Sequence, residues 1–171
     1  MFGPISGAHF NPSVTLGSVI GGGVRIITGI FMVICQFLGG FIGACLARAV
    51  LEREVFLQYA TGLSNVDQDL TKRGQAIIVE LLMTAFIVLA YLMSGVDSDG
   101  HDGPSAASTT ASAYAVSSVA AYRLTGASFN PAKSLACAGG LAVFAPDPSW
   151  GFLYIYFIGP IVGAILAGLL Y

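Results

Sequence analysis

The amino-acid sequence predicts an all-α membrane protein, a helical bundle built from an inverted repeat, with two re-entrant half-helices and four full spans. Of its 171 residues, 56% are hydrophobic and only 9% are charged, whereas about 25% of residues are charged in an average soluble domain. Four stretches have the length of about 20 weakly polar residues that a helix needs to cross a bilayer. Two similar segments, each containing Asn-Pro, lie 119 positions apart.

Three of the four spans are predicted from strongly apolar runs of 22 residues each. The runs at 26–47 and 150–171 contain no charged residue, and the run at 75–96 contains only Glu80. Such runs are long enough to cross the hydrocarbon core as helices. We therefore expect the whole chain, 1–171, to form a single membrane domain.

The fourth span is predicted at 104–122, which is uncharged but rich in serine and threonine. Hydroxyl side chains within a bilayer must face other helices or water, so we expect this helix in the interior of the bundle. The polar segments 48–74 and 97–103 are predicted to be loops.

An internal repeat is the most informative feature of the sequence. The segments 6–17 and 125–136 share six of twelve residues, and the segments 37–47 and 157–167 share six of eleven. Two spans precede the Asn-Pro pair in the second copy, so we expect two further spans before the first copy, which this chain lacks. Because a complete unit has three spans, successive units enter the membrane from opposite sides and form an inverted repeat.

Each Asn-Pro pair is predicted to start a half-helix, the first within 1–21 and the second within 125–139. Asparagine is a preferred N-cap and proline a preferred first helical residue. If the Asn11 and Asn130 oxygens accept backbone N–H groups, their amide NH2 groups remain as donors at the positive ends of the helix dipoles. Two such donors would hold a water molecule by its oxygen, interrupt proton relay and oppose cations.

The segments GAHFNPSVT and GASFNPAKS resemble the paired boxes of the aquaporins, or major intrinsic proteins. The resemblance extends over essentially the whole chain and implies an aquaporin-like fold that lacks the first two transmembrane spans of the family. It also implies a homotetramer in the lipid bilayer, with a pore for water or small solutes in each subunit. The pore boxes are then Asn11, Pro12, Ser13, Asn130, Pro131 and Ala132.

The resemblance also assigns supporting roles to other residues. His9 matches a pore-lining loop histidine, whereas Gln36 and Glu80 match buried polar residues that brace the two half-helix loops. Small residues four positions apart allow close helix crossing. Such pairs are predicted to serve helix packing at Gly39 and Gly43, and at Gly159 and Gly163.

The predicted selectivity filter differs from that of strict water channels. Ser118 stands where such channels commonly carry histidine, and Lys133 stands where the family normally carries arginine. Lysine keeps the positive charge but loses the planar guanidinium group that fixes a narrow wall. With Ala127 at the third position, we expect a constriction wider than that of a strict water pore; water is the favoured solute, and passage of small neutral solutes such as glycerol remains open.

Other classes of function are less consistent with the sequence. The formal charge of −2 gives no basic surface for nucleic acid. The sequence shows no nucleophile paired with a base and no cluster of metal ligands, so we expect neither an enzyme nor a metal site nor a bound cofactor. The alternative is a truncated, non-conducting subunit that associates with full-length aquaporins and regulates them. In either case we expect a multi-pass protein of the plasma membrane.

Overall fold

The computed structural model describes residues 3–60, 70–96, 104–144 and 148–171, and the described part is helical, without strands. This confirms the predicted all-α fold class. The helices are α1 (Gly3–Ser6), α2 (Pro12–Ile20), α3 (Ile26–Val50), α4 (Arg53–Ala60), α5 (Leu70–Gly95), α6 (Pro104–Thr125), α7 (Pro131–Phe144) and α8 (Ile155–Leu170), with a 3-10 turn, η1 (Pro148–Phe152), before α8.

Three of the described helical segments are long and apolar enough to cross a membrane: Ile26–Val50, Lys72–Gly95 and Trp150–Leu170. They correspond to the three strongest spans predicted from the sequence and make the chain a multi-pass membrane protein. The helix α6 is as long as a span but is not one of the three, because its serine and threonine residues lower its hydropathy. Its place as a fourth span stays a prediction.

The region between α3 and α5 differs from its predicted structure. The sequence predicts a loop over 48–74, but α3 continues to Val50, α4 occupies Arg53–Ala60, and α5 begins at Leu70. The buried side chain of Phe56 explains α4, because its ring would contact a methyl group placed on Gly140 of α7. The predicted loop at 97–103 lies outside the described residues.

The two half-helices begin as the sequence predicts. Asn11 has an extended backbone conformation, its Oδ1 accepts a hydrogen bond from the Ser13 N–H at 2.8 Å, and Pro12 is the first residue of α2. The Oδ1 of Asn130 likewise accepts from the Ala132 N–H at 3.0 Å at the start of α7. These contacts satisfy backbone donors that a helix start leaves without partners.

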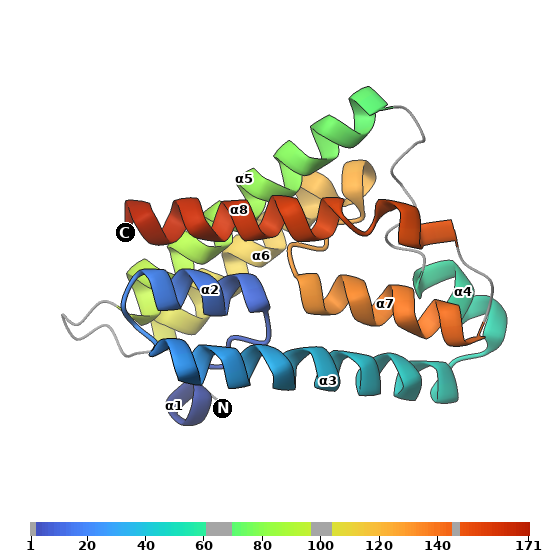
Figure 1. Cartoon of the computed structure of the whole chain (residues 1–171), viewed down its shortest axis with the longest axis horizontal. Helices are drawn as coiled ribbons and strands as arrows, with labels where there is room; N and C mark the ends of the chain where they lie inside the picture. Colours follow the sequence, from blue (N-terminus) through green and yellow to red (C-terminus); the bar gives the residue numbers. More distant parts are fainter. Residues whose placement is uncertain (1–2, 61–69, 97–103, 145–147) are drawn as a thin grey trace.

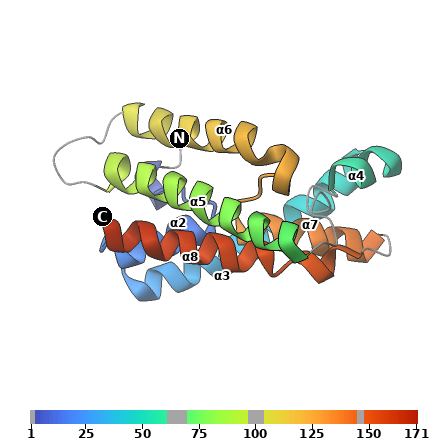
Figure 2. The same cartoon turned by 90° about the horizontal axis from the view of Figure 1, so that it is seen from above.

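The two copies of the repeat pack by exchanging their half-helices. In Figure 1, α2 and α7 lie end to end with their N-termini facing each other. The half-helix α2 packs against α8, which belongs to the second copy, and α7 packs against α3, which belongs to the first. On the far side, α5 lies between α8 and α6 (Figure 2). This exchange brings both Asn-Pro pairs to one place.

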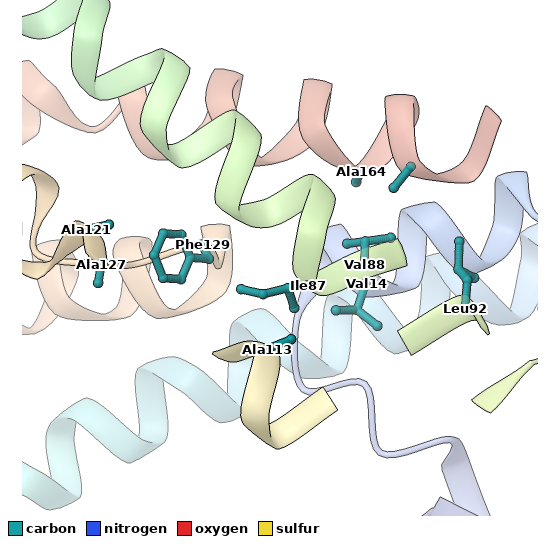
Figure 3. Packing of buried hydrophobic residues seen from close by; sticks show 10 residues of the cluster. Val14, Ile87, Val88, Leu92, Ala113, Ala121, Ala127, Phe129 and Ala164 are labelled. Carbon is teal, nitrogen blue, oxygen red and sulfur yellow. The ribbon is translucent and has the colours of Figure 1, made fainter. Parts of the chain in front are cut away.

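The apolar core lies where α2, α5 and α8 meet. Val14 lies beside Ile87 and Val88, with Ala164 close to them, and all four side chains are nearly inaccessible to solvent (Figure 3). Gly17 permits this approach, because a Cβ atom there would lie 2.3 Å from a methyl carbon of Val88.

The paired glycines of the two copies have different surroundings. A Cβ atom on Gly159 would lie 2.9 Å from the Ile77 carbonyl oxygen, so α8 and α5 cross in close contact. Gly39 and Gly43, the equivalent residues of α3, have open space within 4 Å of the same position among the described residues. A packing role for this second pair stays a prediction.

Candidate functional site

The two loops that precede the half-helices share an uncommon backbone conformation. In the first, Gly7, Ala8 and Phe10 have φ values of 71°, 51° and 48°. The equivalent Gly126, Ala127 and Phe129 have φ values of 80°, 55° and 54°. Residues other than glycine rarely adopt this left-handed region, which costs roughly 1–2 kcal/mol for each residue. The repetition of the same strained conformation in both copies indicates that it has a structural role.

The left-handed conformation directs a backbone carbonyl group of each loop toward the asparagine of the other copy. The Nδ2 of Asn11 donates to the carbonyl oxygen of Phe129 at 2.8 Å. The Nδ2 of Asn130 donates to the carbonyl oxygen of Phe10 at 2.9 Å. Each asparagine thus caps its own half-helix with its oxygen and holds the loop of the other copy with its nitrogen. The two hydrogen bonds fasten the half-helices to each other at their N-termini.

The second N–H of the asparagine side-chain amide has different surroundings in the two copies. The sequence predicts that both amides remain available to a permeating molecule, and for Asn11 this is wrong. Asn11 is completely buried, and its Nδ2 also donates to the Tyr114 hydroxyl at 2.7 Å. An amide has only two N–H groups, so Asn11 has none left. Asn130 is partly exposed, and its second N–H has no partner among the described residues.

The three predicted filter residues line one cavity. Ser118 of α6, Ala127 of the second loop and Lys133 of α7 surround a space of about 310 Å³, together with Asn130 and Tyr114. The Nζ of Lys133 donates to the Ala127 carbonyl oxygen at 3.1 Å, which places the positive charge at the wall of this cavity. The cavity therefore combines a cation and an amide N–H donor.

A wider cavity of about 620 Å³ adjoins the first. It lies between α3 and α7 and shares His9, Phe10, Asn130 and Lys133 with the smaller cavity. The two spaces therefore meet beside the second Asn-Pro pair. Ser13, which follows the first Asn-Pro pair, does not line either cavity, and its buried hydroxyl has no partner among the described residues.

Glu80 of α5 holds the second loop in place. Its carboxylate accepts hydrogen bonds from the Thr125 hydroxyl at 2.6 Å and from the backbone N–H groups of Ser128 at 3.2 Å and Phe129 at 2.7 Å. The side chain is completely buried within a helix that is apolar enough to cross a membrane. A buried charge of this kind requires such partners. Glu80 therefore fixes the left-handed residue whose carbonyl receives the hydrogen bond from Asn11.

His9 and Gln36 perform a similar task around Thr15 of α2. The Thr15 hydroxyl donates to the Asn11 carbonyl oxygen at 3.1 Å and accepts from the Gln36 Nε2 at 2.9 Å. The His9 Nδ1 lies 3.0 Å from the same hydroxyl oxygen. Because the hydroxyl hydrogen is already used, the His9 nitrogen must be the donor. These contacts join the first loop, α2 and α3.

Several residues of the site are not evident from the sequence. The Phe10 and Phe129 carbonyl groups act through the backbone, and their only sequence signal is that phenylalanine precedes asparagine in both copies. Tyr114 lies one helical turn before Ser118, so helical spacing could have placed both on one face. Tyr156, whose hydroxyl donates to the Thr125 carbonyl oxygen at 2.6 Å, carries no such signal.

Comparison with known sequences identifies relatives of the whole chain. The family described as Major intrinsic protein matches residues 1–171. Human (Homo sapiens) aquaporin-2 is 36% identical over 99% of this chain and 59% of its own length. Rat (Rattus norvegicus) aquaporin-8 is 34% identical over 98% of this chain and 61% of its own length.

Mouse (Mus musculus) aquaporin-4 is 37% identical over 99% of this chain and 50% of its own length. The chain thus spans between 50% and 61% of the lengths of these three relatives. The match nevertheless covers both Asn-Pro loops, both half-helices and all of the described long helices. This chain belongs to the major intrinsic protein family.

Proposed function

We propose that the chain forms a membrane channel for the passive transport of water, in which the paired half-helices exclude protons and cations. The observation that carries this proposal is the exchange of hydrogen bonds between Asn11 and the Phe129 carbonyl, and between Asn130 and the Phe10 carbonyl. It holds two helix N-termini together in a segment of the fold that also borders two cavities.

The proposed exclusion of ions follows from the charges that meet there. A helix N-terminus carries roughly half of a positive elementary charge, and the start of α2 faces the start of α7. The Lys133 ammonium group adds a full positive charge at the same cavity. A cation approaching this point meets repulsion, whereas a neutral water molecule can accept a hydrogen bond from the free N–H of Asn130. This single N–H occupies only one of the two lone pairs of the water oxygen, so the proposed exclusion of protons rests on the positive charges at this point.

The proposed solutes are water and small neutral molecules such as glycerol. Ser118 and Ala127 have short side chains, and Lys133 lacks the fixed planar group of arginine. These residues leave the filter cavity at about 310 Å³. We further propose that the other predicted site residues have the roles that the family resemblance assigns to them. The chain is proposed to form a homotetramer, to have four membrane spans that include α6, and to reside in the plasma membrane.

Purified protein in liposomes tests the channel function. We expect an osmotic gradient to shrink proteoliposomes several times faster than protein-free liposomes, because the pore replaces diffusion through lipid. An entrapped pH-sensitive dye should show no faster proton entry under a pH gradient, since the half-helix dipoles oppose protons. Water flux at the protein-free rate would contradict a channel, and a rise in proton flux equal to that of water would contradict the exclusion mechanism.

A double substitution tests the proposed filter. We expect Lys133→Arg with Ser118→His to lower glycerol permeability about tenfold and to preserve water permeability, because two larger planar groups narrow the cavity. Glycerol uptake and water efflux are measured in the same proteoliposomes. Lys72→Arg, an equivalent change outside the cavity, is the matched control and should alter neither rate. Unchanged glycerol uptake in the double variant would remove the filter assignment.

A second candidate function is a non-conducting subunit that associates with full-length aquaporins and regulates them. The open face of α3 favours it, because Gly39 and Gly43 have space for a closely packed helix and Leu38 and Ile42 beside them are 60% and 58% exposed. Co-expression with a full-length aquaporin distinguishes the two functions. A regulator lowers the water permeability of cells below that of the full-length protein alone, whereas a channel adds to it.

A further inference from the structure

Tyr114 belongs to the site, although it is not among the pore residues that the sequence predicts. It lies on α6, one turn before Ser118, and lines the same cavity as Ala127, Asn130 and Lys133. Its hydroxyl oxygen accepts a hydrogen bond of 2.7 Å from the Asn11 Nδ2. A phenol group is thus placed against one of the two asparagines at which the half-helices meet.

We propose that Tyr114 determines what the channel passes, by occupying with its hydroxyl oxygen the hydrogen-bonding place that Asn11 would otherwise offer to a permeating molecule. The inference rests on the proposed function, since it concerns the path through the same pair of half-helices.

The hydrogen bonds of Asn11 carry the argument. Its oxygen accepts from the Ser13 N–H, and its two N–H groups donate to the Phe129 carbonyl and the Tyr114 hydroxyl. Asn11 is also completely buried. A water molecule can therefore bind Asn11 only after the Tyr114 hydroxyl has moved away. Asn130, in contrast, borders both cavities and keeps one N–H.

The hydroxyl of Tyr114 reproduces part of what a bound water would do. Its oxygen accepts from Asn11, and its own hydrogen has no partner among the residues that the structure describes. That hydrogen is available to donate to the next water in the cavity. The direction of hydrogen-bond donation along the path is thus kept. One position in the path, however, is filled by the Tyr114 hydroxyl, which is part of the protein and does not permeate. The aromatic ring takes further space that a larger solute would need.

Two substitutions separate the hydroxyl from the ring. Tyr114→Phe removes the oxygen and frees one N–H of Asn11, so we expect water permeability in proteoliposomes to rise about fivefold, the effect of one neutral hydrogen bond. Tyr114→Ala removes the ring as well, so glycerol uptake should also rise. The matched control is Tyr122→Ala, a tyrosine of the same helix that is 57% exposed and lines neither cavity.

The possible results distinguish this inference from the channel function. If the wild-type protein conducts water and both Tyr114 variants match it, the role of Tyr114 is overturned and the channel remains. If neither the wild type nor any variant conducts water, the channel function is overturned, and the role of Tyr114 falls with it. A wild type of low permeability beside a permeable Tyr114→Ala variant supports both.

Thiol labelling gives a readout that does not depend on transport. In a chain whose three native cysteines are replaced by alanine, Tyr114→Cys should react with a small, charged methanethiosulfonate reagent in liposomes, because position 114 borders the cavity of the proposed water path. Tyr122→Cys should react at least tenfold more slowly, since the exposed position 122 borders neither cavity and, with α6 as the proposed span, its thiol would lie against lipid and stay protonated. Equal rates at both positions would show that Tyr114 does not line the path.

Discussion

The substitution Gly163→Val is expected to separate α8 from α5 and to lower the stability of the protein by about 3 kcal/mol, the upper end of the usual cost of overpacking. A Cβ atom at this position would lie 2.3 Å from the Leu81 carbonyl oxygen and 3.0 Å from the Ala85 nitrogen. Both are backbone atoms of α5, so no side-chain rotation can relieve the overlap. Without a solvent-driven hydrophobic effect between helices in lipid, close packing of this kind is what holds them together.

Thermal melting of the helical circular dichroism signal in detergent measures the effect. A loss of about 3 kcal/mol corresponds to a fall in Tm of roughly 6–12 °C for a chain of this length. Gly43→Val is the matched control, because Gly43 is the repeat equivalent of Gly163 and has open space within 4 Å of its Cβ position. Its Tm should stay within the error of the wild-type value. An equal fall in both variants would mean that helix propensity, not the contact with α5, sets the effect.

The second large effect is expected from Glu80→Ala. This change removes the acceptor of three hydrogen bonds and leaves the buried N–H groups of Ser128 and Phe129 without their partner. Each unsatisfied buried donor costs about 1–3 kcal/mol, so we expect a loss of roughly 4 kcal/mol. The second loop would then lose its left-handed conformation at Phe129, and with it the carbonyl that Asn11 holds. Water permeability should fall to the protein-free rate.

Melting in detergent and proteoliposome shrinkage report these two consequences separately. Glu54→Ala, which removes an exposed carboxylate from α4, should change neither value. Glu80→Gln keeps one acceptor oxygen and should fall between the wild type and Glu80→Ala in both measurements. If Glu80→Ala conducts water normally at a lowered Tm, the carboxylate supports the fold but not the path.

The sequence predicts those parts of the site that depend on local chemistry. Asparagine and proline at the starts of α2 and α7 act within two or three residues along the chain, so the N-caps could be predicted directly. The spans could be predicted because an apolar run of sufficient length has few alternatives to a membrane helix.

The parts that could not be predicted depend on contacts between distant residues or on strained backbone. No pattern indicates that Phe10 and Phe129 adopt positive φ values, since such values are unfavourable for an isolated phenylalanine and persist only through contacts such as those of Glu80. The hydrogen bond from Asn11 to Tyr114 joins residues 103 positions apart. The sequence predicts a loop where α4 forms, because Phe56, the side chain that the described residues show as buried in α4, packs near Gly140, a residue of α7 far along the chain.

The exchanged hydrogen bonds also bear on how such a fold can arise. Each copy gives an asparagine donor and receives through a phenylalanine carbonyl, so the contact is isologous, as in a two-fold symmetric dimer. A gene that encoded a single copy could build the same contact only if its product entered the membrane in both orientations. Duplication and fusion of the gene remove that demand, because each half then has one fixed direction. Once fused, the copies can diverge, as Tyr114 illustrates, whose hydroxyl accepts a hydrogen bond from Asn11 and, among the described residues, not from Asn130.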